Sequence, residues 1–132
     1  MTYLLDTSTC IFALNSERQV VDAMRRNRDK GVCISTITLG ELEYGVFNSK
    51  YQESNRNRLQ SFAPLIQCLE FDTYAAHQYG RLRADLKRSG CLIGHLDMLI
   101  AAHAMSRALI LVTNNVKEFS RIDGLEVVDW SL

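Results

Sequence analysis

Short apolar segments alternate with longer segments of helical character along the chain, and this alternation limits the folds available to it. The apolar segments are too short for helices and read as strands; they are 2–5, 32–35, 66–71, 109–113 and 125–130. The segments between them are rich in helix-forming residues at helical spacing; they are 17–29, 36–49, 52–62, 73–88 and 97–107. Because strands that alternate with helices form parallel sheets, the sequence predicts an α/β fold with about five parallel strands.

The length and composition fit one such domain. The chain has 132 residues, of which 47% are apolar, and a typical domain has about 100–150 residues. We therefore expect residues 1–132 to form a single three-layer α/β/α domain. The 15 Lys and Arg residues balance the 15 Asp and Glu residues, so net charge alone attracts neither nucleic acid nor membrane. No window approaches the ~18 uninterrupted apolar residues of a membrane span.

The four cysteines form no metal or redox motif. They lie far apart in the sequence, with no Cys-x-x-Cys pair and no neighbouring His. Cys33 and Cys68 lie inside apolar segments, where a reduced cysteine behaves as a small apolar residue. We expect buried, reduced thiols in a cytoplasmic protein.

The first apolar segment ends in a carboxylate, Asp6, which three hydroxyl residues follow. In open parallel sheets, ligands bind at the carboxyl ends of the strands, so Asp6 is a candidate site residue. The same residue could instead cap a helix that begins at Thr7. Local sequence favours the two interpretations equally.

Glu41 lies in the helix that is expected after the second strand. A stripe at helical spacing groups Glu41 with Ile37 and Tyr44, which predicts that it points with apolar residues. The competing interpretation is a capping box, Thr38-x-x-Glu41, which would place Glu41 in the first turn of the helix.

Asp97 lies at the start of an almost wholly apolar helix. A carboxylate there is stabilised by the helix dipole, which is a purely structural role. An apolar helix of this kind also packs on the sheet, so its first turn would border the strand ends and bring Asp97 to Asp6 and Glu41. Three carboxylates in one cleft repel each other strongly unless a cation neutralises them.

A last group of polar side chains follows the strand at 109–113. Thr113, Asn115 and Glu118 all carry oxygen donors, although Asn115-x-x-Glu118 also has the form of a capping box. A set of oxygen ligands without Cys or His suits Mg²⁺ or Mn²⁺ far better than zinc. Basic residues gather in 24–30, 56–58 and 81–88. They are either solvated helix faces or, if the last two groups flank the cleft, sites for phosphates.

Taken in order, these segments resemble those of a known family. Asp6 after the first strand, Glu41 in STITLGELEYG, Asp97 opening an apolar helix, and the segment TNNVKEF are together similar to a PIN-domain ribonuclease, specifically a VapC toxin of a bacterial type II toxin–antitoxin pair. Each motif is weak alone, but four in this order and spacing are a strong signal. The resemblance covers essentially the whole chain.

The resemblance implies an α/β/α sandwich and a Mg²⁺- or Mn²⁺-dependent endoribonuclease. It implies metal ligands at Asp6, Glu41 and Asp97, and supporting roles at Thr113, Asn115 and Glu118. It also implies a homodimer, a VapB-type antitoxin as partner, contact with DNA only through that antitoxin, and a tRNA substrate, with the initiator tRNA anticodon loop as the specific expectation.

Two positions depart from the family pattern. Many members carry Asn where this chain has Ser8, and many carry Asp where it has Asn115. The fourth acid is therefore missing or is supplied by Glu118, which leaves one or two metals as alternatives. Loss of one anionic ligand would weaken a second ion first.

Two other classes of protein compete with the nuclease. A receiver-like phosphoryl-accepting domain would use Asp72, Thr113 and Lys117, but it requires adjacent acids after the first strand, where this chain has Asp6 followed by Thr-Ser-Thr. A catalytically silent domain that only binds a partner protein would differ from the nuclease solely in lacking a working metal site.

Overall fold

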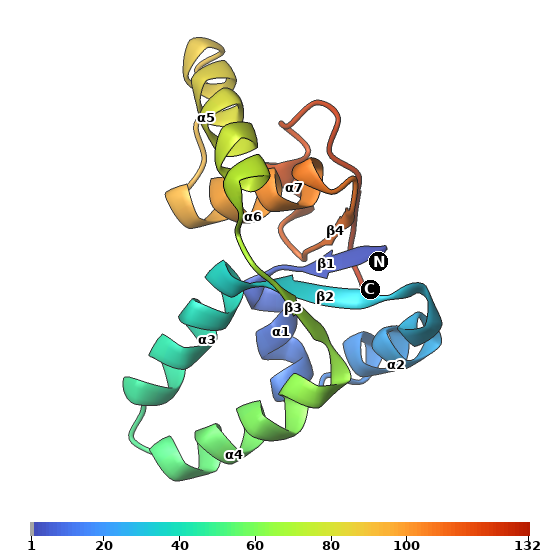
Figure 1. The fold of residues 1–132 in the computed structure, drawn as a ribbon. Helices are drawn as coiled ribbons and strands as arrows, with labels where there is room; N and C mark the ends of the chain where they lie inside the picture. Colours follow the sequence, from blue (N-terminus) through green and yellow to red (C-terminus); the bar gives the residue numbers. More distant parts are fainter. Residues whose placement is uncertain (1) are drawn as a thin grey trace.

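Five parallel strands form the centre of the structure, a computed structural model that describes residues 2–132 (Figure 1). They are β1 (Tyr3–Leu5), β2 (Val32–Ser35), β3 (Gln67–Leu69), β4 (Ile110–Val112) and β5 (Val127–Val128). Their order across the sheet is β3-β2-β1-β4-β5, and every neighbouring pair is parallel. The order reverses at β1, so the chain moves outward first on one side of β1 and then on the other.

The middle of the sheet is its most apolar part. Leu4 of β1 lies in register with Cys33 of β2 and with Leu111 of β4, and all three side chains are fully buried. Parallel strands covered on both faces read as continuous apolar segments, which is why these strands were recognisable in the sequence.

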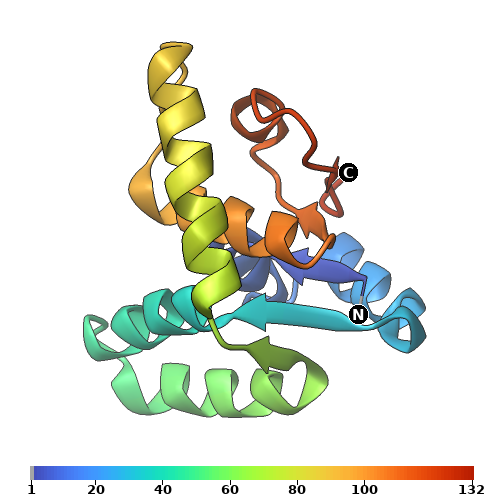
Figure 2. The same ribbon diagram turned by 45° about the horizontal axis from the view of Figure 1, so that its top comes forward.

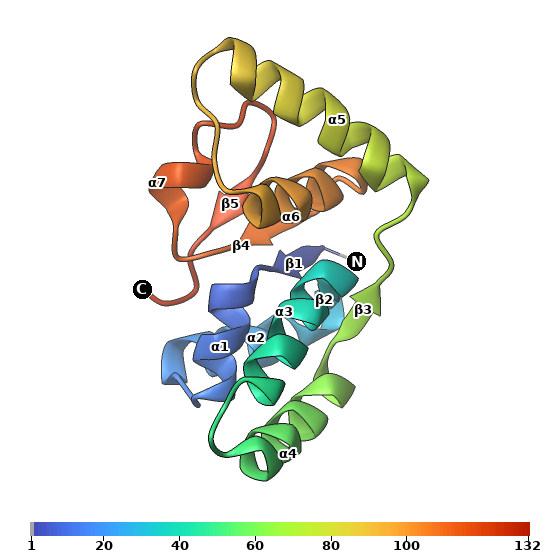
Figure 3. The same cartoon turned by 90° about the vertical axis from the view of Figure 1, so that its left-hand side faces the viewer.

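Helices cover both faces of the sheet, as Figures 1 and 3 show. One layer consists of α1 (Thr7–Leu14), α2 (Arg18–Arg26), α3 (Thr36–Phe47) and α4 (Gln52–Phe62). The other consists of α5 (Thr73–Arg88), α6 (His95–Ser106) and the short α7 (Val116–Phe119). Two single 3₁₀ turns, Arg28–Lys30 and Ala63–Leu65, precede β2 and β3. In Figure 2, α5 projects away from the sheet while α6 lies on it.

Alternate side chains of each strand enter two separate cores. Leu4 belongs to the core under α5 and α6, which contains Met98 and Phe119. Its neighbour Leu5 belongs to the core under α1 to α4, which contains Phe62. Successive side chains of a strand point to opposite faces, so three-residue strands are enough to join both layers.

The predicted α/β/α fold with a parallel sheet is confirmed. The strand positions agree, although β3 and β5 are shorter than the apolar segments around them. The prediction of buried thiols is confirmed for Cys10 and Cys33. It is wrong for Cys68, which is exposed on the edge strand β3, and for Cys91, which is only partly buried. Among the helices within residues 2–132, none is long and apolar enough to cross a membrane.

Candidate active site

The site lies where β1 and β4 end. Asp6 follows β1, and Thr113 follows β4, which pairs directly with β1. Because the two strands are parallel, both residues lie at the same edge of the sheet. A cleft of about 470 Å³ opens there; its walls are Asp6, Thr7, Ser8, Ile11, Glu41, Asp97, Asn114, Asn115 and Phe119.

Asp6 fills both of the roles that the sequence left open. Its carboxylate accepts a hydrogen bond from the Thr9 amide at 2.9 Å and so caps α1. It also lines the cleft, although it is only 4% exposed. A carboxylate has two oxygens with several acceptor sites, and the cap uses one site on Oδ1. Capping is therefore compatible with a role in the cleft.

Ser8 connects Asp6 to the end of β4. Its hydroxyl lies 3.0 Å from Asp6 Oδ1 and 2.7 Å from Asn114 Oδ1. A hydroxyl has one proton, so it donates to one of these oxygens at a time. Sequence patterns indicate Asn115 and give no signal for Asn114, because only the pairing of β1 with β4 brings residue 114 to residue 8.

Glu41 reaches the cleft from the second turn of α3. The helix is capped by Ser35, whose hydroxyl accepts from the Ile37 amide at 3.0 Å, so the predicted capping box Thr38-x-x-Glu41 is wrong. The predicted apolar stripe is also wrong, since Tyr44 is 67% exposed. Glu41 Oε1 instead accepts a hydrogen bond of 2.6 Å from the Thr7 hydroxyl.

Asp97 lies in the first turn of α6 and faces the other acids. Its pKa is raised from the ordinary 3.8 to about 6. The largest cause is burial, followed by a side-chain hydrogen bond with Glu118 and the repulsion of Glu118, Asp6 and Glu41. Carboxylates this close retain a proton between them unless a cation replaces it.

Only part of the segment after β4 lines the cleft. Asn114 and Asn115 are among its walls, whereas Thr113 and Glu118 are not. Asn115 lines the cleft and donates to Glu118 Oε2 at 2.9 Å, so the capping box predicted for these two residues does not form at α7. Thr113 is fully buried, and its hydroxyl accepts from the Asn115 amide at 3.0 Å. Glu118 is outside the cleft walls and acts on the site through Asp97.

The donor chemistry fits a hard divalent cation. Asp6, Glu41 and Asp97 offer carboxylate oxygens, and their mutual repulsion at Asp97 is what a cation would relieve. No three His, Cys, Asp or Glu side chains within residues 2–132 are arranged to hold a metal together as they stand. Mg²⁺ commonly uses only one or two carboxylates and keeps several waters, so this arrangement suits it.

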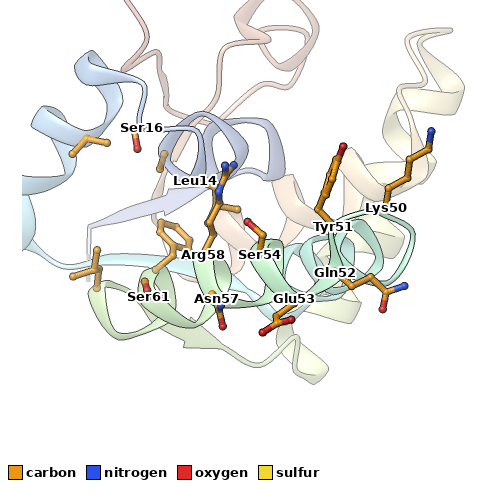
Figure 4. A pocket seen from close by; sticks show the side chains of 14 residues that line it. Leu14, Ser16, Lys50, Tyr51, Gln52, Glu53, Ser54, Asn57, Arg58 and Ser61 are labelled. Atoms are coloured by element: carbon orange, nitrogen blue, oxygen red, sulfur yellow. The ribbon is translucent and has the colours of Figure 1, made fainter.

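A larger hollow of about 900 Å³ lies elsewhere, between the end of α1, α2 and α4 (Figure 4). Arg58 and Lys50 are among its walls, and Glu53 is its one acid. The predicted basic groups therefore do not line the acidic cleft, and Arg56 is paired with Glu43 at 2.7 Å. The larger hollow has no carboxylate cluster, so its chemistry differs from that of the cleft.

The receiver-like arrangement does not assemble. Asp72 follows β3, at the edge of the sheet, whereas Thr113 follows β4, with β2 and β1 between them. Asp72 caps α5 through the Ala75 amide at 3.0 Å and lies 3.6 Å from Arg107. The Asp72 carboxylate therefore has a structural role as a helix cap. The strand that precedes it, β3, is three strands away from β4, the strand that precedes Thr113.

Fold and cleft together define a class, the α/β/α domain with a carboxylate site at the carboxyl edge of a parallel sheet. Comparison with known proteins identifies the family. The model of the PIN domain matches residues 3–125. The chain is 42% identical over 132 residues to the tRNA(fMet)-specific endonuclease VapC of Shigella flexneri, with 99% of both chains covered. It is 39% identical over 134 residues to ribonuclease VapC2 of Rickettsia felis, with 98% of each covered.

Solved structures agree with this assignment. VapBC2 of Rickettsia felis, crystallised with a promoter DNA fragment, matches with a TM-score of 0.94 and 37% identity, covering 98% of this chain and 99% of that one. DNA-bound VapBC of Salmonella typhimurium matches with a TM-score of 0.94 and 40% identity, covering 98% of each chain. The chain belongs to the PIN-domain family and, within it, to the VapC ribonucleases.

Proposed function

We propose that this chain is the toxin of a type II toxin–antitoxin pair and cleaves tRNA as a Mg²⁺- or Mn²⁺-dependent endoribonuclease. The observation that carries the proposal is the cleft in which Asp6, Glu41 and Asp97 meet, from three separate elements of the fold. The substrate follows from relatives in Shigella flexneri and Salmonella typhimurium, 42% and 40% identical, that are named tRNA(fMet)-specific endonucleases. The specific expectation is cleavage in the anticodon loop of initiator tRNA.

The acids of the cleft would hold the cation, directly or through water. When bound, Mg²⁺ or Mn²⁺ lowers the pKa of a water and neutralises charge that builds up on the phosphate. Asp97 is the acid most affected by its neighbours, so its proton would leave as the cation enters. Loading of the site should therefore weaken as the pH falls below about 6.

The polar residues around the acids would orient water and the RNA backbone. Ser8 lies between Asp6 and Asn114. Glu118 lies between Asp97 and Asn115, and Thr113 fixes the backbone of Asn115. Water attacks the phosphorus in line, the bond to the 3′ oxygen breaks, and that oxygen takes up a proton. The products carry a 5′-phosphate and a 3′-hydroxyl.

A toxin of this kind requires a partner that restrains it. Solved relatives are VapBC complexes, two of them bound to DNA. An antitoxin Arg or Lys placed in the cleft would pair with the carboxylates and replace the cation. We further propose that this chain forms a homodimer and that DNA is contacted by the antitoxin.

The proposal is tested by incubating antitoxin-free protein with total tRNA, with Mg²⁺ or with EDTA. Asp97→Asn is the inactive variant. Asp85→Asn is the matched control, because Asp85 is an exposed residue of α5 that lies outside the cleft. We expect cuts at a single site in initiator tRNA that require Mg²⁺ and are abolished in Asp97→Asn only.

Other outcomes discriminate among the alternatives. Cleavage of a different tRNA would overturn the initiator tRNA assignment and keep the nuclease. Folded protein that binds metal but cuts no RNA would favour the catalytically silent, partner-binding domain. Cleavage in EDTA, or by Asp97→Asn, would overturn the proposed site.

A further inference from the structure

Three hydroxyl residues follow Asp6, and each one bonds to a different part of the site. The Thr9 hydroxyl donates to the Val112 carbonyl at 3.1 Å, which fastens α1 to β4. Ser8 lies between Asp6 and Asn114. Thr7 reaches across to α3, where its Oγ1 lies 2.6 Å from Glu41 Oε1. The contact of Thr7 joins α1 to α3 across the cleft.

The Thr7 contact is short and directional. A hydroxyl that donates to a carboxylate at this distance forms a charge-assisted hydrogen bond, which is stronger than one between neutral groups. Thr7 Oγ1 also lies 3.5 Å from Thr38 Oγ1, and Thr38 is fully buried in α3. Thr7 has one proton, so it donates either to Glu41 or to Thr38, and the much shorter distance favours Glu41.

This contact restricts the orientation of the Glu41 side chain at the cleft. A glutamate side chain has several rotatable bonds, so holding it in one conformation costs conformational entropy. Repulsion from the other acids would also turn an unsupported Glu41 away, and Glu41 is among the groups that raise the pKa of Asp97. Thr7 occupies Oε1, and the hydrogen bonds of residues 2–132 leave Oε2 without a protein donor.

We propose that Thr7 is a positioning residue for Glu41: its hydroxyl holds Oε1 and turns Oε2 toward the place where the divalent cation binds. The inference rests on the proposed metal site and adds a residue to it. In this role Thr7 supplies no ligand to the cation. It acts through Glu41, in the way that outer hydrogen bonds orient metal ligands in other proteins.

The test compares two substitutions of similar size. Thr7→Val keeps the branched shape and removes the hydroxyl, whereas Thr7→Ser keeps the hydroxyl and removes the methyl group. Affinity for Mn²⁺ is measured on antitoxin-free protein from the electron paramagnetic resonance signal of free Mn²⁺. Loss of an outer hydrogen bond typically weakens metal binding about 10- to 100-fold, and we expect this range for Thr7→Val and a change of less than about threefold for Thr7→Ser.

A double-mutant cycle with Glu41→Gln separates positioning from general damage. In the Glu41→Gln background, Thr7→Val should change Mn²⁺ affinity by less than about twofold, because the group through which Thr7 acts is already altered. Thermal unfolding checks that each variant is folded. If Thr7→Val does not fold, Thr7→Ala removes the same hydroxyl without placing a methyl group against α3.

Three results would overturn the inference. They are a Thr7→Val protein that binds Mn²⁺ like the wild type, a loss that persists undiminished in the Glu41→Gln background, and a wild type that binds no Mn²⁺. The proposed function is judged separately by RNA cleavage. Protein that shows the expected Mn²⁺ cycle but cuts no RNA would refute the ribonuclease and leave the role of Thr7 standing.

Discussion

Replacing Asp97 by Asn should make the metal-free protein more stable while it abolishes cleavage. The ionised form of Asp97 is disfavoured in the folded chain, where burial and the neighbouring acids raise its pKa to about 6, and it is not disfavoured in the unfolded chain. Asparagine keeps the shape and removes the charge. The variant therefore removes the repulsion between Asp97 and the neighbouring acids. Active sites commonly keep such a destabilising arrangement because their function requires it.

The magnitude follows from the pKa. A rise from 3.8 to about 6, at about 1.4 kcal/mol for each unit of pKa, corresponds to roughly 3 kcal/mol against the ionised form. Asp97 is partly open to solvent, which screens its charge, so we expect about half of this, roughly 1.5 kcal/mol. For a domain of this size, that corresponds to a rise in Tm of about 5 °C.

The pH dependence gives the prediction its sign. Below about pH 3.8 Asp97 is protonated in both the folded and the unfolded chain, so the substitution should have no electrostatic effect. Between pH 3.8 and about 6 the unfolded chain ionises first, which destabilises the wild type progressively. The advantage of Asp97→Asn should therefore grow across this range and stay constant above it.

The measurement is thermal or urea unfolding in EDTA at several pH values, with Asp85→Asn as the control that should change little. Saturating Mn²⁺ should then raise the Tm of the wild type more than that of Asp97→Asn, because the cation binds the folded state. Equal stability of the wild type and Asp97→Asn at pH 8, or an advantage of the same size at pH 4, would refute the reasoning.

Three further variants test the structure around the site. His103 is fully buried in α6. Burial, and then Arg107, lower the pKa of His103, against smaller raising effects of Asp72 and the Glu70 backbone. The unfolded chain therefore takes up a proton first, and wild-type stability should fall as the pH drops below about 6.5. In His103→Leu this decline should be shallower in urea titrations from pH 7 to 5, and an unchanged slope would contradict it. Phe119→Ala should cost about 3–5 kcal/mol of unfolding free energy, because Phe119 is fully buried behind the cleft; a loss below about 1 kcal/mol would disprove its place in the core. Ser35→Ala should cost about 1 kcal/mol through loss of the α3 cap, measured in the same titration, and no loss would mean that the cap is dispensable.

Periodicity and length predicted most of the fold, and they failed where local signals compete. The helix α1 was anticipated only as a possibility behind Asp6, because its sequence TSTCIFAL has strong apolar character, several poor helix formers and no polar face. It forms because Asp6 caps it and because it packs on the sheet. Thr38-x-x-Glu41 has the form of a cap, but β2 ends at Ser35, and Ser35 caps α3 first.

The candidate site was predictable as a set of acids and not as a set of contacts. Asp6 and Asp97 stand at element boundaries that sequence patterns reveal, and Glu41 lies in the second turn of a predicted helix. The structure brings all three to one cleft. The partners of these acids are set by tertiary structure. Thr7 and Glu41 are 34 residues apart, and Ser8 and Asn114 are 106 apart. No local pattern encodes such pairs.

The strand order also bears on how the chain is made. Among the strands of residues 2–132, β1 comes first in the sequence and stands at the centre of the sheet, and one of its two neighbours is β4, from residues 110–112. A growing chain on the ribosome therefore carries Asp6 and Glu41 long before it carries the strand and the Asn114 loop that complete the cleft. Contacts between residues so far apart in sequence form slowly, because a long loop must close before they can be made. A partial chain that ends before β4 therefore lacks one wall of the cleft, so the complete site forms only after residues 114 and 115 have joined the fold.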